Sequence, residues 1–334
     1  MRSLWLIALF LFSMLGSSSA TAQEMTRGDP EIRVIEGPPV VPDDWQALET
    51  PWLTMYGPDY ELQAMMHLAD VGNEALPELA AELGVPIGGT VHVVVAPTRG
   101  QFMNMQPGPV PEYADGTAWP SRGHIYLQRP AIRSSERPIE QVLRHELVHI
   151  LLGRTFAPAT PPTWLQEGTA TLLSGEYDGD MSMLLVQAVA TGHRPSLSAI
   201  SNGFPRHQPR AQLAYAESAD FLVFLRENYG DDAISKLVLA GKQGAPFPAA
   251  VRSVTGEFLE DVERDWRRRF HTGALSWFTL LSNWEMWWAA GGLFAMVGLV
   301  LARRRSNARL TAMAAEEARL DRLMAELFQR DEVG

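Results

Sequence analysis

The feature that most constrains the fold is the segment HELVH at residues 145–149, which has the pattern HExxH. Apolar residues recur around it at helical spacing, so we expect a helix that ends near Gly153. Positions i and i+4 share one face of a helix, so His145 and His149 can bind one metal ion, with Glu146 beside a water on that metal. The pattern therefore predicts a zinc hydrolase site in which Glu146 is the general base. The alternative is an amphipathic helix with two incidental histidines.

A catalytic zinc site needs a third protein ligand, and Glu167 is the candidate. The prolines of residues 157–162 predict a loop after the first helix. A second helix is expected from Thr163 to about Ser174, and it would bring Glu167 back to the metal. The alternative for Glu167 is an ordinary surface carboxylate near a helix N-terminus, where the helix dipole favours it.

HELVH followed by PTWLQEGTA at residues 162–170 resembles the gluzincin zinc metallopeptidases, the thermolysin-like group, and in particular the bacterial peptidase MA-like domain family. The resemblance implies that His145, His149 and Glu167 hold one Zn²⁺ per chain and that Glu146 is the catalytic base. It covers about residues 57–270, with specific motifs only in 145–170.

The segments around the motif predict an α+β, zincin-like fold. Residues 90–96 and 124–127 are expected to be strands of a small mixed β-sheet that precedes the active-site helix, and a mainly helical C-terminal part follows. In relatives, the edge strand of this sheet commonly pairs with extended substrate. Residues 60–83 are expected to form a helix or a helix pair broken near Gly72 and Pro77. A later helix runs from residue 214 to Gly230.

Water attack on a peptide carbonyl produces an oxyanion that needs a second stabiliser beside zinc. Related enzymes use a Tyr or His of a later helix, and Tyr215 is the candidate here. A phenol packed on the core is an equal alternative for Tyr215. His193 and His207 are weaker candidates, for which simple exposure is expected. The sequence does not choose among three groups that could orient the ligand histidines: Thr169, Glu176 and Asp178.

The N-terminal segment predicts export. Residues 1–22 have the basic start, apolar core and A-x-A end of a signal peptide. Residues 23–56 are expected to form an extended arm, and residues 57–272 the metallopeptidase domain. The chain has no cysteine, which excludes disulfides, a thiol nucleophile and a lipid-modified cysteine.

A second apolar stretch, residues 286–302, predicts a transmembrane helix within residues 284–303. Tryptophans precede it and three arginines follow it, as is usual for a span. The alternative is a buried helix of a soluble domain. A span would leave the catalytic domain periplasmic or extracellular and residues 304–334 as a cytoplasmic helical tail, which could dimerise or contact a cytoplasmic partner.

The net charge of −11 speaks against a nucleic-acid partner. The leading hypothesis is therefore a membrane-anchored zinc peptidase that acts on a peptide or protein. A second hypothesis is a catalytically silent or gated binding module with the same fold, which recognises a cell-envelope partner. A third is a membrane anchor whose motif is accidental.

Overall fold

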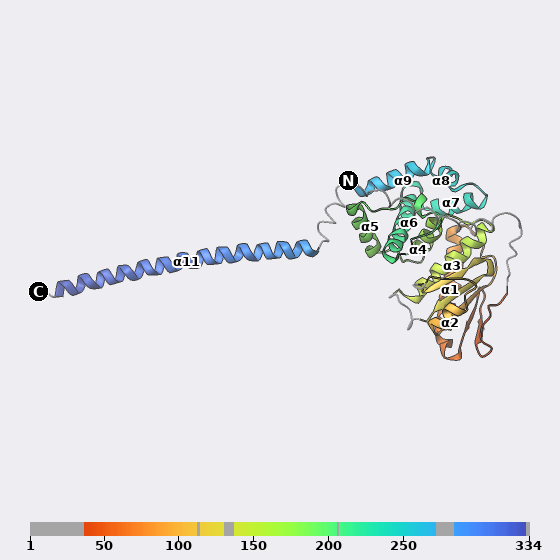
Figure 1. Ribbon diagram of the computed structural model, residues 1–334, viewed down its shortest axis with the longest axis horizontal. Helices are drawn as coiled ribbons and strands as arrows, with labels where there is room; N and C mark the ends of the chain where they lie inside the picture. Colours follow the sequence, from red (N-terminus) through yellow and green to blue (C-terminus); the bar gives the residue numbers. More distant parts are fainter. Residues whose placement is uncertain (1–36, 112–113, 130–136, 206, 272–283, 332–334) are drawn as a thin grey trace, which may run out of the picture. The chain divides into compact units, whose positions relative to one another are not determined.

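The structure is a computed structural model that describes residues 37–111, 114–129, 137–205, 207–271 and 284–331 (Figure 1). The expected signal peptide over residues 1–22 and the first part of the expected arm lie outside these residues. The chain divides into two units. The first combines Met1–Gly179 with Pro195–Glu260, and the second combines Asp180–Arg194 with Asp261–Gly334.

The first unit contains a five-stranded mixed sheet in the order β1-β2-β3-β5-β4. The three central strands are parallel, and β1 and β4 are antiparallel to their neighbours. The central strands are almost continuously buried, as parallel strands covered on both faces usually are. The strands are β1 (Gln46–Glu49), β2 (Leu53–Gly57), β3 (Val91–Ala96), β4 (Gly116–Trp119) and β5 (His124–Gln128).

The sheet begins earlier in the chain than the sequence predicted. β1 and all of β2 except Gly57 lie within the segment expected to be an extended arm over residues 23–56. β2 is fully buried and pairs with β3, so at least residues 46–56 belong to the folded domain. Apolar contact with β3 and the helices, rather than any local signal, fixes this strand.

One face of the sheet packs against α1 (Leu62–Leu83) and α3 (Ile139–Phe156) (Figure 1). α1 is one continuous helix, although a break near Gly72 or Pro77 was an open expectation. A Cβ added at Gly72 would lie 3.0 Å from Leu53 of β2. The glycine therefore marks close contact between helix and sheet rather than a helix end.

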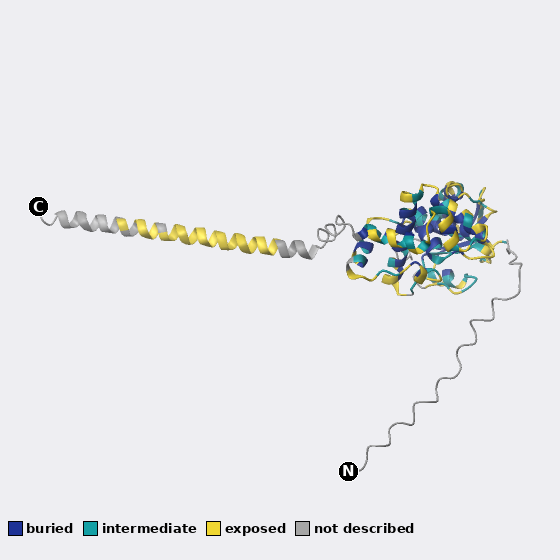
Figure 2. Cartoon of the chain, turned by 90° about the horizontal axis from the view of Figure 1, so that it is seen from above, coloured by how far each residue is buried: buried dark blue, intermediate teal, exposed yellow. Residues whose placement is uncertain are grey.

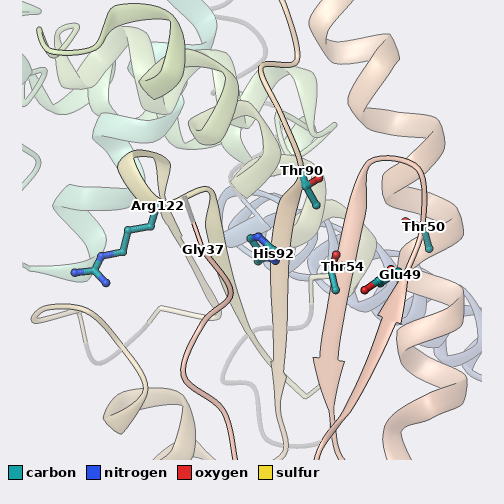
Figure 3. A pocket seen from close by; sticks show the side chains of 7 residues that line it. All are labelled: Gly37, Glu49, Thr50, Thr54, Thr90, His92 and Arg122. Atoms are coloured by element: carbon teal, nitrogen blue, oxygen red, sulfur yellow. The ribbon is translucent and has the colours of Figure 1, made fainter. Parts of the chain in front are cut away.

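The other face of the sheet carries a small apolar cluster around Phe102 of α2 (Arg99–Asn104) and a polar pocket of about 430 Å³. Thr54 and His92 are register neighbours on this face and line the pocket (Figure 3). The Tyr56 hydroxyl lies 3.0 Å from His92 Nδ1. Strand residues alternate between faces, so this pocket lies across the sheet from α3.

The rest of the first unit is mainly helical, which confirms the predicted α+β class. α3 continues three residues past Gly153, where it was expected to end. A Cβ at Gly153 would lie 2.2 Å from Pro120, so the residue provides close packing inside the helix. The further helices are α4 (Thr163–Leu173), α6 (Gln208–Tyr229), α7 (Ala233–Lys242) and α8 (Phe247–Thr255), with short 3₁₀ turns at Asp59–Glu61, Pro120–Arg122 and Ser198–Ile200.

The second unit contains most of α5 (Gly179–Thr191), most of α9 (Leu259–Arg268) and a 3₁₀ turn at Arg269–His271. The Arg194 guanidinium lies 4.5 Å from the ring centroids of both Trp266 and Phe270, so cation–π contacts join the two chain segments of this unit.

The second unit also contains α11 (Trp284–Asp331), whose residues 291–301 are exposed (Figure 2). Within the described part of the chain, no helix has both the length and the apolarity that a membrane crossing requires. The structure does not describe the side chains of the first residues of the expected span over residues 286–302. The span therefore stays a prediction.

Candidate metal centre

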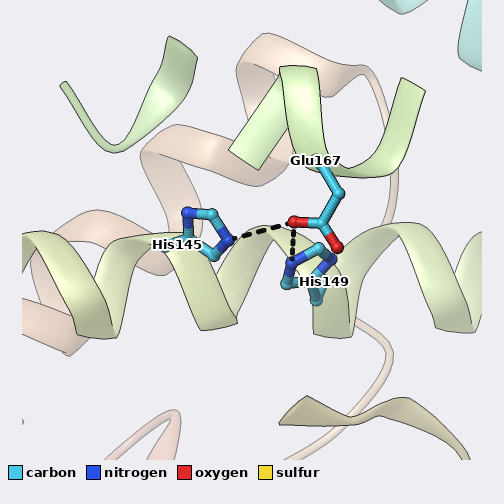
Figure 4. A group of neighbouring side chains, drawn as sticks. All are labelled: His145, His149 and Glu167. Carbon is cyan, nitrogen blue, oxygen red and sulfur yellow. Dashed lines mark ion pairs between the residues drawn. The ribbon is translucent and has the colours of Figure 1, made fainter. Parts of the chain in front are cut away.

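α3 presents the two histidines of the HELVH segment on one face, as the spacing predicted. The ring centroids of His145 and His149 are 4.9 Å apart, and both side chains point toward α4 (Figure 4). Val142, Leu143, Leu147 and Ile150 are buried against the first unit's core. This packing leaves the histidine face directed at the neighbouring helix.

α4 supplies Glu167 between the two histidines (Figure 4). Glu167 Oε2 lies 3.5 Å from His145 Nε2 and 3.4 Å from His149 Nε2. A Cβ added at the neighbouring Gly168 would lie 2.7 Å from the main-chain carbon and oxygen of Ser218 on α6. The close crossing of α4 and α6 therefore sets the position of Glu167.

These three side chains fit a zinc ion. Their ligand atoms all lie within 4.8 Å of one another. Zinc bonds of about 2.0–2.2 Å in a tetrahedron place ligand atoms roughly 3.3–3.6 Å apart, which matches both Glu167 contacts. Two imidazoles and one carboxylate are also the donor set of a catalytic zinc site, which keeps its fourth position open.

Glu176 lies behind His145, on the side away from the candidate metal position. His145 Nδ1 is 3.1 Å from Glu176 Oε1, and Arg137 Nη1 donates to Glu176 Oε2 at 2.6 Å. Glu176 was one of three orienting groups that the sequence left open. Of the others, Thr169 is fully buried on α4 and Asp178 is exposed. Arg137 was missed, because nothing marks it apart from other arginines in the sequence.

The carboxylates around His145 control its charge. Burial alone would lower the pKa of His145, but Glu176 and Glu167 outweigh burial and hold that pKa well above its ordinary value. Burial would raise the pKa of Glu167, but His149 and His145 hold it well below its usual range. Without metal, the cluster therefore keeps a proton on His145 between ionised carboxylates.

Glu146 lies between the histidines and the edge strand β4. A Cβ added at Gly116 of β4 would lie 2.9 Å from Glu146 Oε1, so the carboxylate rests against the strand backbone. Burial raises the pKa of Glu146, while His145 and His149 oppose the rise. Because Gly116 has no side chain, this strand position leaves room for the carboxylate. Gly116 was not among the residues that the sequence analysis singled out.

The structure also brings Tyr215 of α6 close to the histidines. Its ring centroid lies 6.5 Å from that of His145, and Phe204 packs edge-on against it at 4.9 Å. Of the weaker candidates, His207 is exposed at the start of α6, and His193 is exposed and belongs to the second unit.

The fold and the two-histidine, one-glutamate group are those of a gluzincin-type chain. A family model described as the Peptidase MA superfamily matches residues 73–272, so the chain belongs to that superfamily. This confirms the resemblance that the sequence motifs carried. No significant match to this chain was found among curated proteins.

Solved structures resemble the chain more distantly. Native yeast LTA4 hydrolase shares 15% identity, with a TM-score of 0.42, over 67% of this chain and 38% of its own. A point mutant of an M1 zinc metallopeptidase from Deinococcus radiodurans shares 18% identity, with a TM-score of 0.40, over 66% of this chain and 50% of its own. The chain thus matches half or less of the length of these structures.

Proposed function

We propose that this protein is a zinc-dependent peptidase in which His145, His149 and Glu167 hold the metal and Glu146 is the general base. The observation that carries the proposal is the convergence of these four side chains beside an edge strand. When bound, zinc would supply a Lewis acid for the substrate carbonyl and lower the pKa of an attacking water. The substrate is a peptide or protein.

The edge strand supports this proposal because it can hold a peptide through its backbone. Among the described residues, β4 pairs with β5 and with no other strand. Gly116 and Ala118 of β4 both lie on the sheet face that packs against α3. An extended peptide paired with the free edge of β4 would pass beside Glu146. From there Glu146 can take a proton from the attacking water and pass it to the leaving amine.

Tyr215 is our candidate for stabilising the developing oxyanion. Its ring lies beside His145, on the helix that follows the ligand helix in the fold. A phenol hydroxyl is a suitable donor to an oxygen that gains negative charge during attack.

We further propose that the peptidase is exported and anchored by residues 286–302, with its catalytic domain periplasmic or extracellular. The uncharged apolar stretch, the tryptophans before it and Arg303, Arg304 and Arg305 after it support this proposal. The helical tail over residues 304–334 would then be cytoplasmic, where it could pair with a second copy. Carbonate extraction of membranes, with protease protection of each end, tests the arrangement. Release of the full chain by carbonate would refute it.

The activity test compares the purified full-length protein with Glu146→Gln on a diverse peptide mixture, with products read by mass spectrometry. The variant keeps the size and metal ligands of the site and removes the base. We expect cuts from the wild type that Glu146→Gln lacks, at equal zinc content. If the folded, zinc-loaded wild type cleaves no peptide, the binding-module hypothesis is favoured. If the wild type and Glu146→Gln cleave peptides equally well, Glu146 is not the base.

A further inference from the structure

We propose that Arg137 is a positioning residue of the metal centre, which holds the Glu176 carboxylate so that His145 directs Nε2 toward the metal. The inference rests on the proposed zinc site but not on its peptidase activity. Arg137 lies just before the start of α3 and is linked to His145 through Glu176. No motif around Arg137 indicates such a role.

The main chain of Glu176 is already fixed by a tight turn after α4. The N–H groups of Glu176 and Tyr177 both donate to the carbonyl of Thr171, at 3.1 and 3.2 Å. Gly175 has a φ of 80°, which only glycine adopts without strain. The Tyr177 hydroxyl donates to Asp220 of α6 at 2.6 Å. The turn therefore fixes the start of the Glu176 side chain but leaves the carboxylate plane free to rotate.

Arg137 removes this remaining freedom. Glu176 Oε2 accepts from Arg137 Nη1 at 2.6 Å, while Oε1 lies 3.1 Å from His145 Nδ1 as an ion-pair contact outside hydrogen-bond geometry. The Glu176 side chain is 2% exposed, so the guanidinium is the group that satisfies Oε2 in a place with little access to water. Without Arg137, the Glu176 carboxylate would lose one of its two charged partners and could rotate. Its oxygen would then contact His145 Nδ1 less often.

The consequence for His145 follows from the two nitrogens of its ring. A carboxylate at Nδ1 favours the tautomer with the proton on that nitrogen, which leaves the Nε2 lone pair for a metal. Nε2 is the atom that faces Glu167. Loss of orienting partners of this kind typically lowers metal affinity about 10- to 100-fold. Because Arg137 is half exposed and one contact further out, we expect an effect near the lower value, about 10-fold.

A purely structural role is the competing explanation, because Arg137 directly precedes α3 and could anchor the start of that helix. Arg129 provides a matched control. It lies just after β5, is similarly half exposed, and its Nε is 3.0 Å from the buried carboxylate of Glu61. Glu61 makes no ion pair with a metal ligand among the described residues. Arg129→Gln therefore breaks another pair between a half-exposed guanidinium and a buried carboxylate without touching the metal centre.

The experiment measures zinc affinity of the full-length protein by competition with a chromophoric chelator, and the unfolding temperature of the metal-free form. The variants are Arg137→Gln, Arg137→Lys, Glu176→Gln, the double variant Arg137→Gln/Glu176→Gln, and Arg129→Gln. We expect Arg137→Gln to weaken zinc binding about 10-fold. Arg137→Lys should recover most of the loss because an ammonium can still pair with the carboxylate. Arg137→Gln should add nothing in the Glu176→Gln background.

The outcomes separate the two proposals. If the wild type binds no zinc, the proposed function fails and the role of Arg137 falls with it. If the wild type binds zinc and Arg137→Gln binds it equally well, only the inference about Arg137 is overturned. An equal loss in Arg129→Gln, or an additive loss in the double variant, would also overturn it. If Arg137→Gln fails to fold, the zinc affinities of Arg137→Lys and Arg129→Gln are compared instead. Equal affinities at normal unfolding temperatures overturn the inference. Weaker zinc binding by Arg137→Lys alone supports it.

Discussion

Substitution of Gly168 by alanine should loosen the proposed metal site and destabilise the protein by at most about 2 kcal/mol. The new Cβ would lie 2.7 Å from main-chain atoms of Ser218, whereas ordinary contact begins at 3.4 Å. Ordinary contact would need a displacement of 3.4 − 2.7 = 0.7 Å between α4 and α6, and the shortest spacing that real Cβ atoms show, 3.0 Å, would need 0.3 Å. Ser218 presents its backbone there, so α6 cannot relieve it by a rotamer change.

This displacement exceeds what a metal site tolerates. Zinc–ligand distances hold within about 0.2 Å, and Glu167 is the residue adjacent to the shifted position. Overpacking costs about 1–3 kcal/mol, while alanine gains up to about 1 kcal/mol over glycine inside a helix. We therefore expect a net destabilisation of about 0–2 kcal/mol and a fall in zinc affinity of about 10-fold or more.

Urea unfolding of the metal-free protein and chelator competition measure the two quantities separately. Gly100→Ala is the control, because Gly100 is also helical but has open space where the Cβ would be. It should stabilise the protein slightly and leave zinc binding unchanged. Wild-type zinc affinity in Gly168→Ala would refute the argument that the α4–α6 crossing positions Glu167.

Three further predictions concern the site itself. Glu167→Ala should lower zinc occupancy measured by metal analysis, and unchanged occupancy would remove Glu167 from the ligand set. Tyr215→Phe should lower kcat about 100-fold with little change in bound zinc, whereas a packing role would lower the unfolding temperature instead. Because carboxylates raise the pKa of His145 in the metal-free protein, zinc must displace a proton, so affinity should rise as pH increases from about 6 to 8. Calorimetry in buffers of different ionisation enthalpy would detect this proton, and its absence at pH 7 would contradict the reasoning.

The sequence could predict that the two histidines of the candidate metal centre share a helix face, because that depends on local geometry and one motif. The i, i+4 spacing alone places His145 and His149 on one face of a helix. Glu167 became a candidate because a zinc site needs a third ligand and a loop and second helix follow the motif, and the resemblance strengthened that choice. Helical spacing does not say which later carboxylate comes near the histidines. Only the structure shows that the α4–α6 crossing brings it there.

Other parts could not be predicted because tertiary packing decides them. A glycine near the end of an apolar run usually marks a helix end, but contact with Pro120 keeps Gly153 inside α3. The choice of Glu176 among the orienting candidates depends on the turn at Gly175, which aims one carboxylate at His145. β2 is recognisable only once β3 is there to pair with it.

Gly116 and Gly168 lie beside different parts of the proposed site, the base and a metal ligand, and a pair of variants can test these parts separately. Each glycine lies where a Cβ would meet the surroundings of one functional glutamate: Gly116 faces Val142 of α3 at 2.8 Å and the carboxylate of Glu146 at 2.9 Å, and Gly168 adjoins Glu167. Both atoms facing Gly116 belong to side chains, so Gly116→Ala should displace the base, the Val142 side chain or the edge strand while the backbone of α3 keeps the histidines in place. We therefore expect it to lower peptide turnover at unchanged zinc affinity, the reverse of the primary effect of Gly168→Ala. Loss of zinc from Gly116→Ala would show instead that β4 and the ligand helices move as one body.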